Sequence, residues 1–185
     1  MSRRDRPPIP VVLTLPAEAP TPAEVDAILQ ATDVLVGRGG RSGLALVLKG
    51  SASQKVREQG WDRSPAYGEL SRYTVDEITT KVDWCIHHRW LHIEYERGIP
   101  LLYFTEKGWE RVKALWVRRL LEQFTAWQKA DALQQLWPQM QHVHRDIKLM
   151  LLTAIAQGQR RDLVRRCKPG KLTRSRRCAR QSARR

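Results

Sequence analysis

Residues 91–108, LHIEYERGIPLLYFTEKG, constrain the fold of this chain more than any other stretch of its sequence. Two short apolar runs alternate with a period of two, as half-buried strands do, and they meet at Arg97-Gly98. This dipeptide can adopt the positive φ that a tight hairpin turn requires. The sequence therefore predicts an antiparallel hairpin. One face is expected to carry Leu91, Ile93 and Tyr95, and one face of the return strand Leu102 and Phe104.

Helical patterns come before the hairpin. Thr21-Pro22-Ala23-Glu24 is a capping box with proline at the first helical position, which predicts a helix over residues 21–36. GRGGRSG at 37–43 is expected to form a loop. The apolar run at 44–49 is ambiguous by periodicity, and we interpret it as a helix because its apolar residues share one helical face. A second short helix is predicted over 53–59.

One more helix is predicted directly before the hairpin. After a loop at 60–70, Thr74 and Glu77 form a second capping box, and apolar residues recur at helical spacing from 75 to 88. Helices followed by a two-stranded hairpin give the element order of a winged helix. The expected fold class is therefore mainly α with a small β-hairpin.

A helical layer is predicted after the hairpin. A long helix is expected from 105 to about 130, followed by helices over 131–137 and 146–157 with Pro138 as the break between them. Such paired helices would suit a HEAT-like hairpin, and residues 160–175 could add further turns. We therefore divide the chain into a disordered or extended proline-rich lead (1–20), a winged-helix domain (21–110), a helical domain (111–166) and a basic tail (167–185).

The net charge of +14 points to nucleic acid or another polyanion as partner. Its distribution is uneven, because residues 160–185 hold 12 Lys or Arg against one acid and leave a net charge of only +3 for residues 1–159. A basic tail of this kind is compatible both with a specific site elsewhere and with loose electrostatic attraction alone.

Several other classes of protein are not expected. Apolar runs of about 18 residues are absent and prolines interrupt the N-terminal apolar stretch, so neither a membrane span nor a secretory signal is predicted and the cytoplasm is the default compartment. Cys85, Cys167 and Cys178 lack the spacing of zinc ligands, and no side chains complete a metal set with the histidines, so no cofactor is expected. No nucleophile and base pair stands out, which argues against an enzyme.

The segment LVLKGSASQKVREQGWDRSPAYGEL resembles the RQC domain, the winged helix at the end of the catalytic core of RecQ-family helicases. The similarity continues through the TVDEI helix, the wing and the LLYFTEKG return strand. Chain length makes it look most like stand-alone bacterial minor RQC proteins, which implies DNA binding near the nucleoid, in repair or replication. A G-x-x-x-x-G-K-[ST] loop and the zinc-binding cysteines of many RecQ proteins are absent, so ATP-driven unwinding is not expected of this chain alone.

The resemblance also implies a phosphate site. RQC domains use an L-[KR]-G-S-x-S-x-[KR] segment to hold backbone phosphates, and the matching residues here are Lys49, Ser51 and Lys55. Gly50 gives the turn between them its conformational freedom. Cations beside a hydroxyl and backbone N–H groups suit this chemistry. The alternative is that these lysines lie on a solvated helix.

The distribution of charge favours DNA contact through the first half of the winged helix, which holds this phosphate site. Residues 37–72 have a net charge of +4, whereas residues 73–108 have a net charge of −2. The helix over 75–88 is expected to expose Asp76, Glu77 and Asp83 against Lys81 in its first turns, and these acids would repel a groove lined by phosphates. Contact through the first half and the wing is therefore favoured, with Arg57, Arg63 and Arg72 as further basic candidates.

The wing tip departs from the RQC pattern. Several RQC wings carry an aromatic residue that stacks on a terminal base pair, whereas this tip reads Tyr95-Glu96-Arg97-Gly98-Ile99. Tyr95 could stack on a base and Arg97 could meet a phosphate, or both could be ordinary hairpin residues. The tryptophans and Tyr67 are interpreted as packing residues rather than as platforms for bases.

The sequence thus predicts a non-enzymatic DNA-binding protein that contacts the backbone of duplex ends, junctions or other structured DNA with low sequence specificity. The alternative is an adaptor whose C-terminal helices dock a protein partner, and a sequence-specific regulator is a weaker third. The complete set of expected DNA-binding residues is Lys49, Gly50, Ser51, Lys55, Arg57, Arg63, Arg72, Tyr95 and Arg97.

Overall fold

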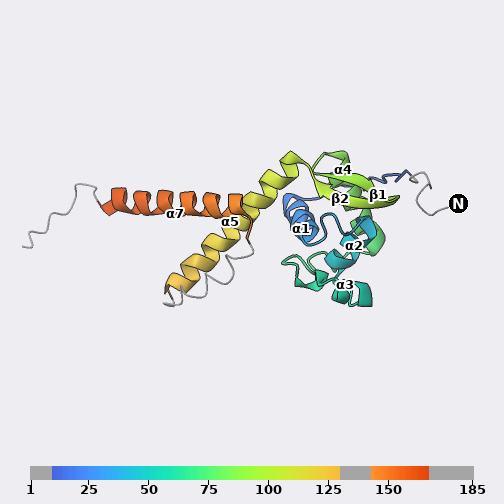
Figure 1. The fold of residues 1–185 in the computed structure, drawn as a ribbon, viewed down its shortest axis with the longest axis horizontal. Helices are drawn as coiled ribbons and strands as arrows, with labels where there is room; N and C mark the ends of the chain where they lie inside the picture. Colours follow the sequence, from blue (N-terminus) through green and yellow to red (C-terminus); the bar gives the residue numbers. More distant parts are fainter. Residues whose placement is uncertain (1–9, 130–142, 167–185) are drawn as a thin grey trace, which may run out of the picture.

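The computed structural model describes residues 10–129 and 143–166 of the chain, and Figure 1 shows its helices and one hairpin. The elements before the hairpin are α1 (Pro22–Asp33), α2 (Arg41–Lys49), α3 (Gln54–Glu58), the 3-10 turn η2 (Trp61–Arg63) and α4 (Val75–His87). The hairpin consists of β1 (Leu91–Glu96) and β2 (Ile99–Phe104), and it is followed by α5 (Glu106–Lys129) and α7 (Arg145–Arg166).

The hairpin has the geometry that the sequence predicts. β1 and β2 pair antiparallel, with Leu91 opposite Phe104 and Ile93 opposite Leu102. Arg97 and Gly98 both have positive φ, at 52° and 79°, which lets the two strands turn back within two residues. Leu91 and Leu102 are fully buried against the helices, so this face of the hairpin belongs to the core.

The core of the winged helix lies between α1, α2, α4 and the hairpin. Both predicted capping boxes are present, at Thr21 with Glu24 and at Thr74 with Glu77, and they start α1 and α4 where expected. The largest side chains without exposure in this core include Ile28, Leu44, Leu48, Ile78 and Trp61. Burial of these apolar side chains supplies the main stabilisation of the domain.

Two helix limits differ from the sequence prediction. α1 ends at Asp33 rather than at 36, and α2 begins at Arg41 within the segment expected to be a loop. Gly43 lies inside α2, where a Cβ atom would be 3.0 Å from the Trp61 ring, so the close packing of this ring on the helix needs glycine at position 43. Close packing thus overrides the loop preference of a glycine-rich segment.

Residues 10–20 form an extended segment that is hydrogen-bonded to the winged helix. The Thr14 N–H donates to Asp83 over 2.8 Å, the Val11 N–H donates to the Tyr95 hydroxyl over 3.0 Å, and Arg41 donates to the Val12 carbonyl. Of the two alternatives, disordered or extended, residues 10–20 are extended, because their backbone groups find partners on α2, α4 and β1. Residues 1–9 lie outside the described residues.

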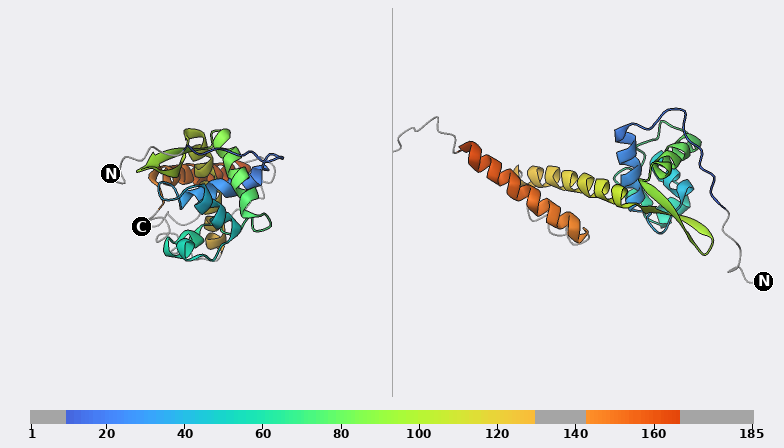
Figure 2. Two further views of the ribbon diagram at one scale, coloured as in Figure 1. Left: turned by 90° about the vertical axis from the view of Figure 1, so that its right-hand side faces the viewer. Right: turned by 90° about the horizontal axis from the view of Figure 1, so that it is seen from above.

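α5 and α7 form a helical arm on the side of the winged helix away from the hairpin tip (Figures 1 and 2). A second, smaller core joins them and includes Val117, Leu120, Ile147 and Leu151. Both helices run away from the winged helix (Figure 2). The HEAT-like pairing of the helices over 131–137 and 146–157 stays a prediction, because the first of them is not among the described residues. α7 also extends to Arg166 rather than ending near 157, whereas the helix predicted over 131–137 lies outside the described residues.

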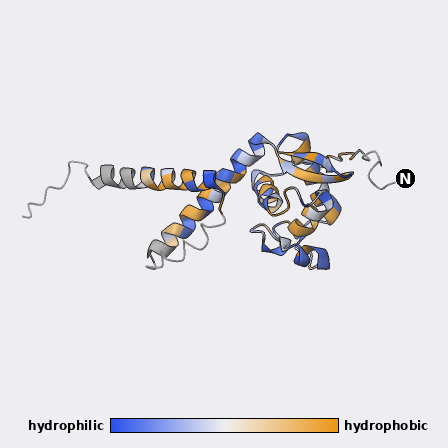
Figure 3. Ribbon diagram, viewed as in Figure 1, coloured by the Kyte–Doolittle hydropathy of each residue, from blue (hydrophilic) through white to orange (hydrophobic). Residues whose placement is uncertain are grey.

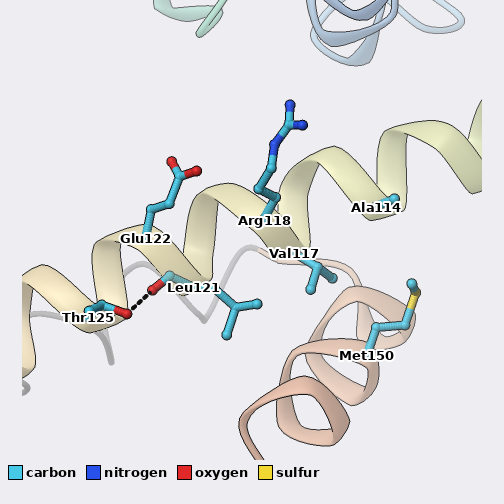
Figure 4. Close-up of a pocket in the computed structure, with 7 residues that line it drawn as sticks. All are labelled: Ala114, Val117, Arg118, Leu121, Glu122, Thr125 and Met150. Atoms are coloured by element: carbon cyan, nitrogen blue, oxygen red, sulfur yellow. Dashed lines mark hydrogen bonds between the residues drawn. The ribbon is translucent and has the colours of Figure 1, made fainter. Parts of the chain in front are cut away.

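A shallow groove of 430 Å³ lies between α5 and α7, lined by Ala114, Val117, Arg118, Leu121, Glu122, Thr125 and Met150 (Figure 4). Val117 and Leu121 point toward α7, whereas Arg118 points away from it (Figure 4). None of the described helices combines the length and the apolar character needed to cross a membrane.

Candidate nucleic-acid interface

The turn between α2 and α3 places the residues of the predicted phosphate site. Gly50 ends α2 in the left-handed conformation, with φ at +77°, and a Cβ atom there would lie 3.1 Å from the Cα atom of Gly68. Glycine is therefore required by both conformation and space. The Ser51 hydroxyl accepts a hydrogen bond from the Ser53 N–H over 3.3 Å, which fixes the entry into α3.

Lys49 is engaged within the protein. Its ammonium group donates to the carbonyls of Ser71 and Tyr73, over 2.7 and 2.8 Å. It thereby ties the end of α2 to the segment that leads into α4. An ammonium group carries three N–H donors, so these two bonds leave one donor to meet a phosphate.

Lys55, Arg57 and Arg63 form the exposed basic part of this region. All three are exposed on or just after α3, which Figure 3 colours as hydrophilic. The Lys55 ammonium lies 5.8 Å from the centre of the buried Trp61 ring, and none of the three cations has an ion pair among residues 10–129 and 143–166. Their positive charges are therefore not neutralised by the described part of the protein.

Arg72 belongs to a different structural unit, which we call the Glu24 cluster (Glu24, Arg72, Tyr73 and Lys81). The Glu24 carboxylate is 4% exposed and accepts hydrogen bonds from Tyr73 at 2.6 Å, Arg72 at 3.0 Å and Lys81 at 3.0 Å. Burial alone would raise the pKa of Glu24, but the hydrogen bonds from Tyr73, the Thr21 N–H, Lys81 and Arg72 outweigh it and lower the pKa to about 2. Arg72 remains two-thirds exposed, so its charge is only partly used here.

The wing places Tyr95 and Arg97 differently. The Tyr95 side chain is partly exposed, and its hydroxyl accepts the hydrogen bond from Val11, so the extended N-terminal segment lies beside it. Arg97 is exposed at the turn. The wing and α3 lie at the end of the molecule opposite the helical arm (Figure 1).

Two of the four charged residues in the first turns of α4 are buried, one acid and one base, so the net charge of its exposed residues stays at −2. Asp83 is 1% exposed and pairs with Arg41 over 2.6 Å, and Lys81 is buried beside Glu24. The expectation that Asp83 and Lys81 face solvent is therefore wrong, because each has a buried or half-buried partner of opposite charge. Asp76 and Glu77 are exposed at the start of α4, so the acidic first turn remains.

Sequence reasoning missed a cleft that the fold forms between the winged helix and the arm. Arg63, Trp109, Trp116, Arg119 and residues of the α7 start line it, and its volume is 520 Å³. The two tryptophans were interpreted as packing residues, and they do pack against both hydrophobic cores. Arg119 is adjacent in sequence to the apolar stripe of α5, but only the tertiary arrangement brings it near Arg63.

Helices α1, α2 and α4 with a two-stranded wing, and the basic region around α3 between α2 and α4, define a winged-helix domain. A family model described as the RQC domain matches residues 22–133, more than half of the chain. The chain belongs to the RQC domain family, whose members are DNA-binding winged-helix modules. Searches of curated proteins and of solved structures found no significant match.

Proposed function

We propose that this chain is a non-enzymatic DNA-binding protein that contacts the phosphate backbone of duplex ends or junctions with low sequence specificity. The observation that supports it most is the group of unneutralised cations around α3, Lys55, Arg57 and Arg63, next to the turn at Ser51. Lys and Arg that meet phosphates give affinity without reading sequence.

The arrangement of α4 supports backbone contact rather than insertion into a groove. Its first turn exposes Asp76 and Glu77, and the pKa of Glu77 is lowered by hydrogen bonds from Thr74, which keeps this carboxylate charged. Two negative charges at the leading end of a helix oppose entry into the major groove. Low sequence specificity follows, because base edges are read mainly there.

The Lys55→Ala/Arg57→Ala double variant tests this interface. We expect its affinity for a blunt duplex to fall roughly a hundredfold or more, because two hydrogen bonds to charged groups are lost, at about 1.5–3 kcal/mol each. The slope of log affinity against log salt should become shallower by about two, one for each lost phosphate contact. Fluorescence anisotropy across a salt series measures both, and circular dichroism checks that the fold is intact. Lys49 is left unchanged because it holds the chain leading into α4.

Two controls separate this interface from general attraction by charge. Arg145→Ala/Lys148→Ala removes the same charge from the first turn of α7, which belongs to the arm and not to the α3 region, and should change the affinity for the blunt duplex little. A chain that ends at Arg166 lacks the basic tail but keeps all of α7. If tail removal abolishes binding while the α3 variant binds like the wild type, the assignment to α3 is wrong.

An adaptor function is the second candidate. The groove between α5 and α7, together with Leu149 and Leu152 at 53% and 62% exposure, supports it, since exposed large apolar side chains favour protein contacts. The chain ending at Arg166 decides between the two candidates. Measurable affinity for blunt or forked duplex at moderate salt favours DNA binding, and no affinity favours the adaptor.

A further inference from the structure

The cleft between the winged helix and the arm, which we call the Trp116 cleft, combines aromatic rings with two cations. Its key lining residues are Asp33, Arg63, Trp109, Trp116, Arg119 and His144. They come from α1, η2, α5 and the residue before α7, so the cleft exists only when the arm is packed on the winged helix. At 520 Å³ it has the size of sites that hold small organic ligands.

The charges in the cleft favour an anion. Arg63 and Arg119 are exposed and make no hydrogen bond or ion pair within the described parts of the chain. Asp33 is the one acid among the lining residues, and its carboxylate accepts a hydrogen bond from the Trp116 indole over 3.0 Å. Burial raises the pKa of Asp33, and the bond from Trp116 opposes this only in part. The two arginines therefore make the electrostatic potential in the cleft positive.

The aromatic side chains give the cleft walls that suit a flat ring. Trp109 and Trp116 are half-buried, and the His144 ring packs edge-on against Trp109 with 5.4 Å between ring centres. The hydrogen bond from Trp116 to Asp33 fixes the orientation of the Trp116 indole. Aromatic side chains beside arginines are the combination that holds unpaired bases and their phosphates.

We propose that the Trp116 cleft binds one unpaired nucleotide of a DNA strand, with its base against Trp109 and Trp116 and its phosphate at Arg63 and Arg119. The inference rests on the proposed function, because Arg63 follows α3 and so joins the cleft to the phosphate interface. A duplex that lies on α3 would thus send a single-stranded end toward the arm.

The test compares a blunt duplex with duplexes that carry a three-nucleotide overhang of either polarity. We expect the wild-type protein to bind one overhang duplex roughly tenfold more tightly than the blunt duplex, the range expected for base stacking. An overhang of abasic nucleotides keeps the phosphates and should lose most of this gain. The Arg119→Gln variant should lose most of it too, with unchanged affinity for the blunt duplex.

Arg118→Gln is the matched control, because it removes the same charge one residue earlier on α5. Arg118 is 64% exposed and lines the groove between α5 and α7 rather than the Trp116 cleft (Figure 4). This variant should keep the preference for the overhang. Trp109 and Trp116 are not replaced, because they also pack the two hydrophobic cores together.

The outcomes separate the two proposals. If blunt duplex binds and depends on Lys55 and Arg57, but overhangs add nothing or Arg119→Gln behaves like Arg118→Gln, the cleft inference is overturned and the proposed function stands. If deoxynucleoside monophosphate binds while overhangs add nothing, the cleft serves free nucleotides and the inference also falls. If no DNA binds at all, both proposals fail.

Discussion

Replacement of Gly108 by alanine is expected to destabilise the protein by about 3 kcal/mol, at the upper end of what overpacking costs in a core. Gly108 is buried in the first turn of α5, where it faces the backbone of Trp90, the residue before β1. A Cβ atom at this position would collide with the Trp90 carbonyl oxygen, and backbone cannot move aside as a flexible side chain can. α5 would have to shift away from the hairpin, and the arm would shift with it.

Gly158→Ala is the control for this prediction, because Gly158 also lies inside a helix. A Cβ atom at Gly158 would meet nothing within 4 Å, so alanine adds helix propensity there without a clash. We expect a gain of up to about 1 kcal/mol. Thermal unfolding followed by circular dichroism compares the two variants. Equal stability of both would mean that α5 does not approach Trp90 as closely as described.

Replacement of Glu24 by glutamine is expected to cost about 3 kcal/mol at pH 7, because it removes the only negative charge from the Glu24 cluster. Lys81 is 9% exposed and would lose its anionic partner, and Tyr73 and Arg72 would lose their charged acceptor. These contacts connect α1 with α4 and with the segment before it. Urea unfolding at pH 7 measures the loss of free energy.

The pH dependence of this effect follows from the lowered pKa of Glu24. Its pKa is about 2 in the folded protein against 4.5 ordinarily, so the unfolded chain takes up the proton more readily. The stabilisation is therefore fully present above about pH 5 and is lost as the pH falls toward 2. The shift corresponds to about 3 kcal/mol. The difference in unfolding free energy between wild type and Glu24→Gln should thus shrink between pH 5 and pH 2.

Glu69→Gln serves as the control, since Glu69 is an exposed carboxylate with no ion pair in the described part of the chain. It should leave both the stability at neutral pH and its dependence on pH nearly unchanged. If the difference in unfolding free energy between Glu24→Gln and the wild type were the same at pH 3 and at pH 7, this would contradict the role given to the Glu24 carboxylate.

The local patterns of the sequence predict much of the winged helix. The capping boxes at Thr21 and Thr74 mark their helices, because each supplies a side-chain acceptor for otherwise unpaired N–H groups. Arg97-Gly98 marks the turn, since its positive φ is a local backbone property. α2 is the exception: its start depends on room for the Trp61 ring against Gly43, which is a contact distant in sequence.

The contacts of charged residues could not be predicted in the same way. Asp83 falls at a helix position that periodicity leaves unassigned, and only the fold shows Arg41 and the Thr14 N–H beside it. Lys49 matches a phosphate-binding motif by spacing, yet two of its donors meet carbonyls 22 and 24 residues further along the chain. Arg119 and Arg63 line the same cleft only because the arm packs on the winged helix. Long-range pairs of this kind leave no periodic signal.

α5 is a single unbroken helix of 24 residues that begins against the hairpin and ends in the arm. At 1.5 Å per residue it is about 36 Å long, and its first turn is held by Gly108 and Thr105 against the strand start. Because α5 is fixed to the hairpin at one end, it sets the distance between the hairpin and the arm. Whatever binds between α5 and α7 would therefore be held at a set distance and direction from bound DNA, without a flexible linker to adjust either.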